Sequence, residues 1–207
     1  MLRWLGLAAL CFVAGSAAVA QSGAPAQPIR DDPAYDGRFT FVRLASLVLT
    51  LDDPELFNHP IVFMWEPGFW NLTDREAESF REYLLKGGFA VFEDFDGSQQ
   101  WNHFEAQMRR ALPEGRLVGL KTTHPIFDSF FRIKDINAIL HPMYGLRPSY
   151  YGIFEDNDPA KRLLVIANFD NDVPEHWEWS GQGLYPVDAS NEAYKLGVNY
   201  VLYGVMH

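Results

Sequence analysis

A strand–helix–strand unit within residues 61–92 constrains the fold of this chain more than any other feature. Ile61–Trp65 and residues 89–92 are wholly apolar, which is typical of strands that are covered on both faces. Between them, Thr73 begins a predicted amphipathic helix with the spacing of a capping box, and Gly87 follows the last turn as a helix-ending glycine. Two buried strands joined by such a helix form a right-handed parallel crossover. The sequence therefore predicts an α/β domain.

The rest of the chain continues this alternation of apolar runs and amphipathic stretches. Further strands are predicted at 39–51 (one long strand or two that abut), 117–120, 150–154 and 162–167, and further helices at 101–112 and 190–207. The predicted fold is a three-layer sandwich, with helices on both faces of a mainly parallel sheet. Residues 37–207 are predicted to form one such domain.

The first twenty residues have the layout of a signal peptide. A single Arg3 precedes a short apolar centre, and Ala18 and Ala20 supply the small residues of a cleavage site, so residues 1–20 are expected to be removed. A membrane anchor needs about 20 apolar residues, and the apolar run here is shorter. Only a signal peptide that stays uncleaved would therefore hold the protein at a membrane. Residues 21–36 lack periodicity and are predicted to be a flexible leader. We expect a periplasmic or secreted protein.

Charge and cysteine content narrow the function classes. Loss of the signal leaves 16 basic residues against 27 acidic ones, a net charge near −11, which disfavours nucleic acid and anionic lipid as partners. The single cysteine, Cys11, leaves with the signal, so the exported chain has neither a thiol nucleophile nor a disulfide. Any catalysis would have to use oxygen or nitrogen groups.

Several stretches together resemble one bacterial family. They are LDDPELFNHPIVFMWEPGFWNLTDREAESFREYLLKGGFAVFEDFDG at 51–97, THPIF at 123–127, NFD at 168–170 with the later WE and YP, and AYKLGVNYVLYGVMH at 193–207. The chain is similar over residues 39–207 to the family catalogued as domain of unknown function 4159. That resemblance implies the class I glutamine amidotransferase-like (flavodoxin-like) fold of the trehalose-utilisation-protein-like domains. It implies fold more strongly than function.

The chain departs from the family pattern in two places. Only residues 45–48 lie between the FTFVRL-like strand and the LTLDDPELF-like stretch, so the first β–α unit is shortened. A parallel crossover does not fit in so few residues, so we expect either that the first strand lies at an edge of the sheet or that the unit is rearranged. Between Asn168 and Trp177, the sequence DNDVPEH is longer than the turn found in the family.

Acidic residues follow the predicted strand at 89–92, where an open α/β sheet places its ligands. In the fold that the chain resembles, this turn carries the cysteine of catalytic members, and here acids replace it. One interpretation makes Glu93 or Asp94 a general base or a metal ligand. Asp96, His124 and Asp170 would then converge from neighbouring loops around a hard cation or a water.

Two other interpretations of the same residues stay open. In a structural one, Asp94 or Asp96 caps the helix that contains Trp101, and Glu93 pairs with an arginine. In the other, the site binds a ligand without turning it over. His124 precedes a proline and also fits a tight turn, and Trp101 fits the core as well as a platform for a sugar ring. No closed metal motif is present, so neither a metal nor another cofactor is predicted.

The leading hypothesis is an exported binding or assembly module of the cell envelope that is not an enzyme. The candidate crevice consists of Glu93, Asp94, Asp96, Trp101, His124 and Asp170. The family resemblance implies protein partners such as MoxR-type ATPases or von Willebrand-type A domain proteins. The alternatives are a carboxylate- or metal-dependent hydrolase acting on a carbohydrate-like substrate, and a purely structural remnant.

Overall fold

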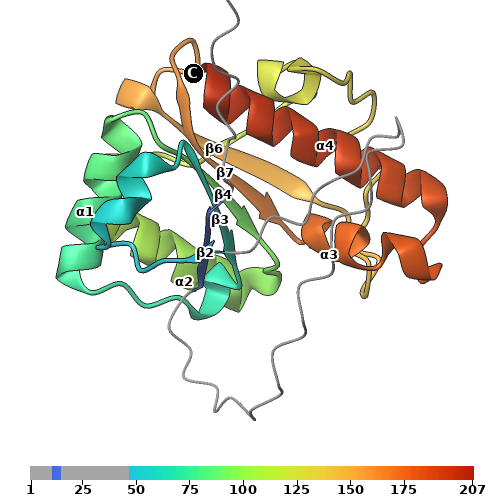
Figure 1. Ribbon diagram of the computed structural model, residues 1–207, viewed down its shortest axis with the longest axis horizontal. Coiled ribbons are helices and arrows are strands. Elements are labelled where there is room, and N and C mark those ends of the chain that lie inside the picture. Colours follow the sequence, from blue (N-terminus) through green and yellow to red (C-terminus); the bar gives the residue numbers. More distant parts are fainter. Residues whose placement is uncertain (1–10, 15–46) are drawn as a thin grey trace, which may run out of the picture.

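The computed structural model describes residues 11–14 and 47–207 (Figure 1). The strands are β1 (Cys11–Ala14), β2 (Leu47–Val48), β3 (Ile61–Trp65), β4 (Phe89–Glu93), β5 (Val118–Gly119), β6 (Ser149–Phe154) and β7 (Leu163–Phe169). The α-helices are α1 (Asp74–Leu85), α2 (Gly97–Ala111), α3 (Val173–Glu178) and α4 (Val187–Met206). The predicted leader, residues 21–36, and the predicted signal peptide apart from β1 lie outside the described residues.

The sheet is mixed. Five strands follow one another in the order β3, β4, β7, β6 and β5, and the short strands β1 and β2 extend the sheet beyond β3. β3, β4 and β7 run parallel, whereas β6 pairs antiparallel with β7 and β5 pairs antiparallel with β6. The five strands thus contain as many antiparallel pairings as parallel ones, and the prediction of a mainly parallel sheet is wrong.

The connection between β6 and β7 explains the antiparallel half. Only residues 155–162 join the two strands, and they contain a single short 3₁₀ turn, Glu155–Asn157. A parallel crossover needs about a dozen residues or more, so this connection can make only a hairpin. At the other margin, Leu47–Val48 is the only strand that the structure describes within the predicted run 39–51, and it lies at the edge of the sheet.

Helices cover both faces of the sheet, which confirms the α/β class (Figure 1). α1 and α2 lie against one face, where Val62, Met64 and Phe92 are buried with Phe80 and Phe104 from these helices. α4 lies against the other face, on the strand residues that alternate with the first set. Because each strand of the centre is covered on both sides, its sequence is continuously apolar.

Local signals place the boundaries of α1 where the sequence predicts them, whereas α2 and α4 begin a few residues before the predicted starts at 101 and 190. The Thr73 hydroxyl accepts the backbone N–H of Glu76 at 3.2 Å, and the Glu76 carboxylate accepts the backbone N–H of Thr73 at 2.8 Å, so the capping box at the start of α1 is formed. Gly87 follows the helix with φ +118°, a conformation that side chains disfavour. Among the described helices, none combines the length and the apolar character that crossing a membrane requires.

The contact between α4 and the sheet gives a first prediction. A Cβ atom at Gly204 would lie 2.4 Å from Ile61 Cγ1 and 3.0 Å from the ring of Phe89. Gly204→Ala is therefore expected to lower the free energy of unfolding by about 1–3 kcal/mol, as overpacking does in well-packed cores. Gly181→Ala is the control, because a Cβ atom there meets no atom within 4 Å. Urea unfolding followed by tryptophan fluorescence measures both, and equal stability of the two variants would contradict close packing at Gly204.

Candidate functional site

The carboxyl ends of β3, β4 and β7 meet at one edge of the sheet, and each is followed by an acid in the left-handed conformation. The φ angles are +50° at Glu66, +59° at Asp94 and +57° at Asp170. This conformation is uncommon for residues other than glycine, and it occurs preferentially in tight turns and at functional sites. Three such residues at three neighbouring strand ends therefore mark this edge as the candidate site.

Backbone hydrogen bonds hold two of these loops together. Asp94 N–H donates to the carbonyl of Asn171 at 3.1 Å, and Asp170 N–H donates to the carbonyl of Phe95 at 3.0 Å. The Asp170 carboxylate also accepts the backbone N–H of Gly97 at 3.1 Å, at the first residue of α2. Asp96 stands at the N-cap of α2, but its side chain makes no capping bond. Asp170, which follows β7, thus accepts a hydrogen bond from the first turn of α2. The Asp96 side chain does not cap this helix.

Glu93 lies beneath the site rather than on its surface. Its side chain is fully buried, and its carboxylate accepts hydrogen bonds from the Asn168 amide and, at 3.4 Å, from the backbone N–H of Val173. The Tyr200 hydroxyl donates to Asn168 Oδ1 at 3.0 Å and completes the network. Burial, and then the charge of Asp172, raise the pKa of Glu93 well above its usual range. The partner is an asparagine and not the arginine that the structural interpretation expects.

Two partly exposed carboxyl groups have pKa values close to neutrality. Burial raises the pKa of Asp94 to about 6, and the nearby carboxylates of Glu66, Glu175 and Asp96 add to the effect. Burial raises the pKa of Asp172 to about 7, and the charge of Asp94 is the next cause. Each group therefore titrates in a field of other negative charges. At neutral pH the two carboxyl groups carry less than their full charge.

The short helix α3 and its N-cap residue contribute two acids to the site, Glu175 and Asp172. Asp172 caps it by accepting the backbone N–H of Glu175 at 3.1 Å. The Glu175 carboxylate accepts the hydroxyl hydrogen of Tyr185 at 2.9 Å, and the Tyr185 ring lies 5.0 Å from the ring of His176. His176 is buried and contacts the carbonyl of Leu140 at 3.2 Å through Nε2. α3 is thereby joined to the loop around residue 140 and to the segment before α4.

His141 reaches the site from that loop. The ring is 5 % exposed, and Nδ1 accepts the backbone N–H groups of Met143 at 3.2 Å and of Tyr144 at 3.4 Å. Because Nδ1 is an acceptor, the hydrogen of the neutral ring is on Nε2. Nε2 lies 3.9 Å from the Asp96 carboxylate, which is beyond hydrogen-bond distance. Burial lowers the pKa of His141, against the opposing charges of Asp96 and Asp170.

These residues form one group, which we call the strand-end cluster. It consists of Glu66, Asp94, Asp96, Asp170, Asp172 and Glu175 together with His141. Within residues 47–207, no lysine or arginine forms an ion pair with any of these acids. The same part of the chain holds no three His, Cys, Asp or Glu side chains in an arrangement suited to a metal ion. The cluster is thus a concentration of negative charge without a basic partner among the described residues.

His124 lies at the other end of the sheet. Its Nδ1 accepts the backbone N–H of Ile126 at 3.2 Å, and its ring lies 5.5 Å from the ring of Phe154. Phe154 pairs with Leu163, the first residue of β7, whereas the cluster follows the last residue of that strand. His124 therefore forms the tight turn that one of the two interpretations of its sequence describes, and it is not part of the cluster.

Trp101 belongs to the aromatic packing on the α2 face. Its ring lies 4.5 Å from Tyr151 and 4.9 Å from Phe169, and it stacks on Phe95 at 6.3 Å. The side chain is partly buried against the core of this face. These contacts account for Trp101 as a packing residue.

Four members of the cluster are not among the residues predicted from the sequence, namely Glu66, His141, Asp172 and Glu175. A signal exists for Glu66, which directly follows the predicted strand at 61–65, and for His141, because His141-Pro142 repeats the dipeptide at His124. Asp172 and Glu175 lie in the segment 168–177, where the chain departs from the pattern of the family that it resembles. The resemblance therefore gives no expectation for them.

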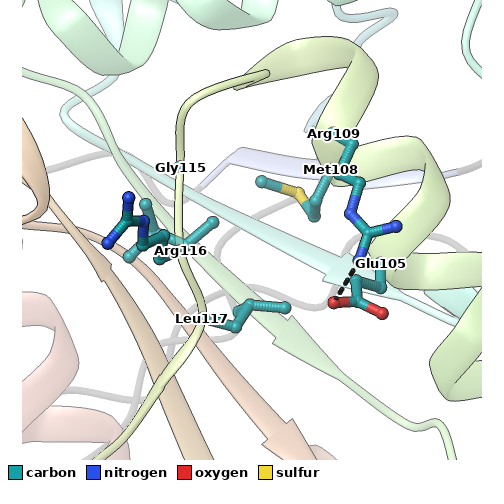
Figure 2. Close-up of a pocket in the computed structure, with 7 residues that line it drawn as sticks. Glu105, Met108, Arg109, Gly115, Arg116 and Leu117 are labelled. Atoms are coloured by element: carbon teal, nitrogen blue, oxygen red, sulfur yellow. Dashed lines mark hydrogen bonds and ion pairs between the residues drawn. The ribbon is translucent and has the colours of Figure 1, made fainter.

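A separate hollow of about 260 Å³ lies between α2 and the loop at 115–117 (Figure 2). The Glu105–Arg109 ion pair, at 2.8 Å, borders one side of it, and Met108, Leu117 and Ile153 supply apolar surface. No member of the strand-end cluster lines this hollow. It is thus a different surface from the candidate site.

Comparison with known proteins identifies the family of the chain. A sequence description of the family "Domain of unknown function (DUF4159)" matches residues 38–205, which covers nearly all of the predicted domain. The match confirms the family resemblance drawn from the sequence. No curated protein matches the chain.

Proposed function

Since the chain belongs to the DUF4159 family, whose description assigns no activity, we propose its function from its own geometry: it is a binding module that holds a cationic group of its ligand in the strand-end cluster. The observation that carries this proposal is the accumulation of carboxylates at three neighbouring strand ends without a lysine or arginine partner in residues 47–207. A cation placed among Asp94, Asp172 and their neighbours would relieve the charge repulsion that, after burial, raises their pKa values.

An organic cation suits the cluster better than a metal ion. Within the described residues, no three potential ligands are arranged for a metal. A guanidinium or ammonium group needs only hydrogen-bond acceptors spread over several ångströms, and it forms strong charge-assisted bonds with carboxylates. The binding role is the non-catalytic function that the sequence favours.

The proposal includes a relation to the glutamine amidotransferase-like domains. β3, α1 and β4 form a parallel crossover, and Asp94 has φ +59° at the turn between β4 and α2. A strained strand-to-helix turn of this kind carries the nucleophile in several α/β enzymes. We infer a glutamine amidotransferase-like ancestry in which an acid occupies that turn. The predicted signal peptide supports export to the periplasm, and its cleavage would remove β1 from the sheet. In the periplasm, MoxR-type ATPase or von Willebrand-type A domain systems would be the partners.

The test of the binding role is titration with agmatine, a small guanidinium compound. Binding is expected to lower the pKa values of Asp94 and Asp172, as followed by NMR of their carboxyl carbons. Asp94→Asn and Asp172→Asn should each weaken binding about tenfold, equivalent to about 1.4 kcal/mol. Both changes preserve the local structure, because asparagine tolerates the left-handed conformation and is a good N-cap.

Glu78→Gln is the matched control, since Glu78 is an exposed acid on α1 outside the cluster. It should leave the affinity for agmatine unchanged. If agmatine does not bind, or if all three variants bind equally well, the proposed function is wrong.

One observation favours an alternative, a carboxylate-dependent hydrolase for a carbohydrate-like substrate. Neighbouring acids with pKa values of about 6 and about 7, at Asp94 and Asp172, suit general acid–base catalysis near neutral pH. This alternative predicts release of reducing ends from soluble polysaccharides by the wild type and loss of that activity in Asp94→Asn. A wild type without measurable release, or a variant of equal activity, would reject it.

A further inference from the structure

Exposed apolar side chains flank the strand-end cluster on two sides. On the loop that carries His141, Met143 is 69 % exposed and Tyr144 is 61 % exposed. On the segment that carries Tyr185, Leu184 is 61 % exposed and Val187 is 73 % exposed. Exposed apolar side chains that gather beside polar and charged groups are typical of surfaces that bind other proteins.

Contacts within the structure tie both apolar segments to the acids. The Tyr144 ring lies 4.7 Å from the His141 ring, whose Nε2 faces Asp96. The Tyr185 hydroxyl donates to the Glu175 carboxylate at 2.9 Å, so Leu184 and Val187 lie on a segment that is anchored to the cluster. We call Met143, Tyr144, Leu184 and Val187 the apolar rim. The rim residues thus lie on two segments that contact members of the cluster.

His141 adds a hydrogen-bond donor to this surface. The side chain is only 5 % exposed, and Nε2–H has no hydrogen-bond acceptor among the described residues. The nearest charged atom, on Asp96, is 3.9 Å away, which is too far for a hydrogen bond. Nε2 itself is not enclosed, so its hydrogen can be donated to water or to an acceptor atom on a ligand.

We propose that the ligand of this surface is a polypeptide segment in which arginine or lysine alternates with apolar residues; this rests on the proposed function. The carboxylates would bind the cationic side chain of the peptide, and the apolar rim would contact the apolar residues next to it in the peptide. His141 Nε2–H would donate to a backbone carbonyl of the peptide. A polyamine offers neither apolar side chains nor a carbonyl. An anionic lipid surface and nucleic acid are repelled by a chain of net charge −10.

The experiment compares two fluorescein-labelled peptides of equal charge, Gly-Leu-Arg-Leu-Arg-Leu-Gly and Gly-Ser-Arg-Ser-Arg-Ser-Gly, by fluorescence anisotropy. The wild type is expected to bind the leucine peptide about tenfold more tightly than the serine peptide. Met143→Ser/Val187→Ser should abolish that preference. Leu85→Ser is the control, because Leu85 is 55 % exposed on α1, away from the rim, and should leave the preference intact.

The outcomes separate this inference from the proposed function. If both peptides bind equally well while agmatine still binds, the polypeptide ligand is wrong and the cation site stands. If the Leu85→Ser variant loses the preference as fully as the double variant, the apolar rim is not the contact surface, and the inference is overturned. If neither the peptides nor agmatine bind, both proposals fail.

Discussion

Asn168→Leu is expected to lower the free energy of unfolding by about 3–5 kcal/mol, because it breaks a hydrogen-bonded network at the centre of the sheet. Asn168 on β7 donates to the buried Glu93 carboxylate and accepts from the Tyr200 hydroxyl on α4. All three side chains are fully buried. The leucine would leave the Glu93 carboxyl group with only the 3.4 Å contact to the Val173 N–H, and the Tyr200 hydroxyl with no acceptor. Urea unfolding monitored by circular dichroism measures the loss.

Glu93→Gln tests whether the charge of Glu93 or its hydrogen bond to Asn168 determines the stability of this network. The raised pKa of Glu93 already favours the neutral form, so replacement by a neutral amide should change the free energy of unfolding by only about 1 kcal/mol. Equal destabilisation by Glu93→Gln and Asn168→Leu would show that the charge of Glu93, rather than its hydrogen-bond partner, determines stability here.

The second large effect is a dependence of stability on pH that originates in the strand-end cluster. The folded pKa values of about 6 for Asp94 and about 7 for Asp172 lie above the ordinary value of 3.8. Between those values the folded protein binds more protons than the unfolded chain, so these two groups make stability fall as pH rises from about 4 to 7. Relative to the wild type, Asp94→Asn/Asp172→Asn should gain about 2–4 kcal/mol between pH 5 and pH 8, after allowance for partial exposure.

The comparison between wild type and double variant isolates this effect. His124, His141 and His176 have pKa values lowered by burial, and they act in the opposite direction because their protonation destabilises the fold at low pH. Their contributions are shared by both proteins and cancel in the difference. A difference in unfolding free energy that stays constant from pH 5 to pH 8 would mean that Asp94 and Asp172 titrate as ordinary acids.

The elements that depend on local sequence are predicted well. The helix that begins after Thr73 and the strands at 61–65 and 89–93 form where their caps and apolar runs indicate. The antiparallel half of the sheet is not predicted. The apolar run that becomes β7 is continuous, as is typical of a strand buried on both faces, and nothing in such a run encodes the direction of its neighbour.

The candidate site was likewise predicted only in part from the sequence. Asp94, Asp96 and Asp170 are found from the sequence, because acids that directly follow a buried strand must emerge at an end of the sheet. His141 and Glu175 reach the same edge from a loop and from a short helix that lie far from Asp94 along the chain. Glu93 and Asp94 are adjacent in sequence, but one is fully buried in a network and the other lies at the surface.

The sequence by itself determined the α/β class, the family, the boundaries of α1 and the acids that end the strand β4. It could do so because apolar periodicity and capping operate over a few neighbouring residues. Only the tertiary structure decided the mixed sheet, the burial of Glu93 and the gathering of His141, Asp172 and Glu175 around Asp94. These features arise from pairing between segments that are distant along the chain, and the pKa of a carboxyl group depends on the charges and the burial that such pairing creates.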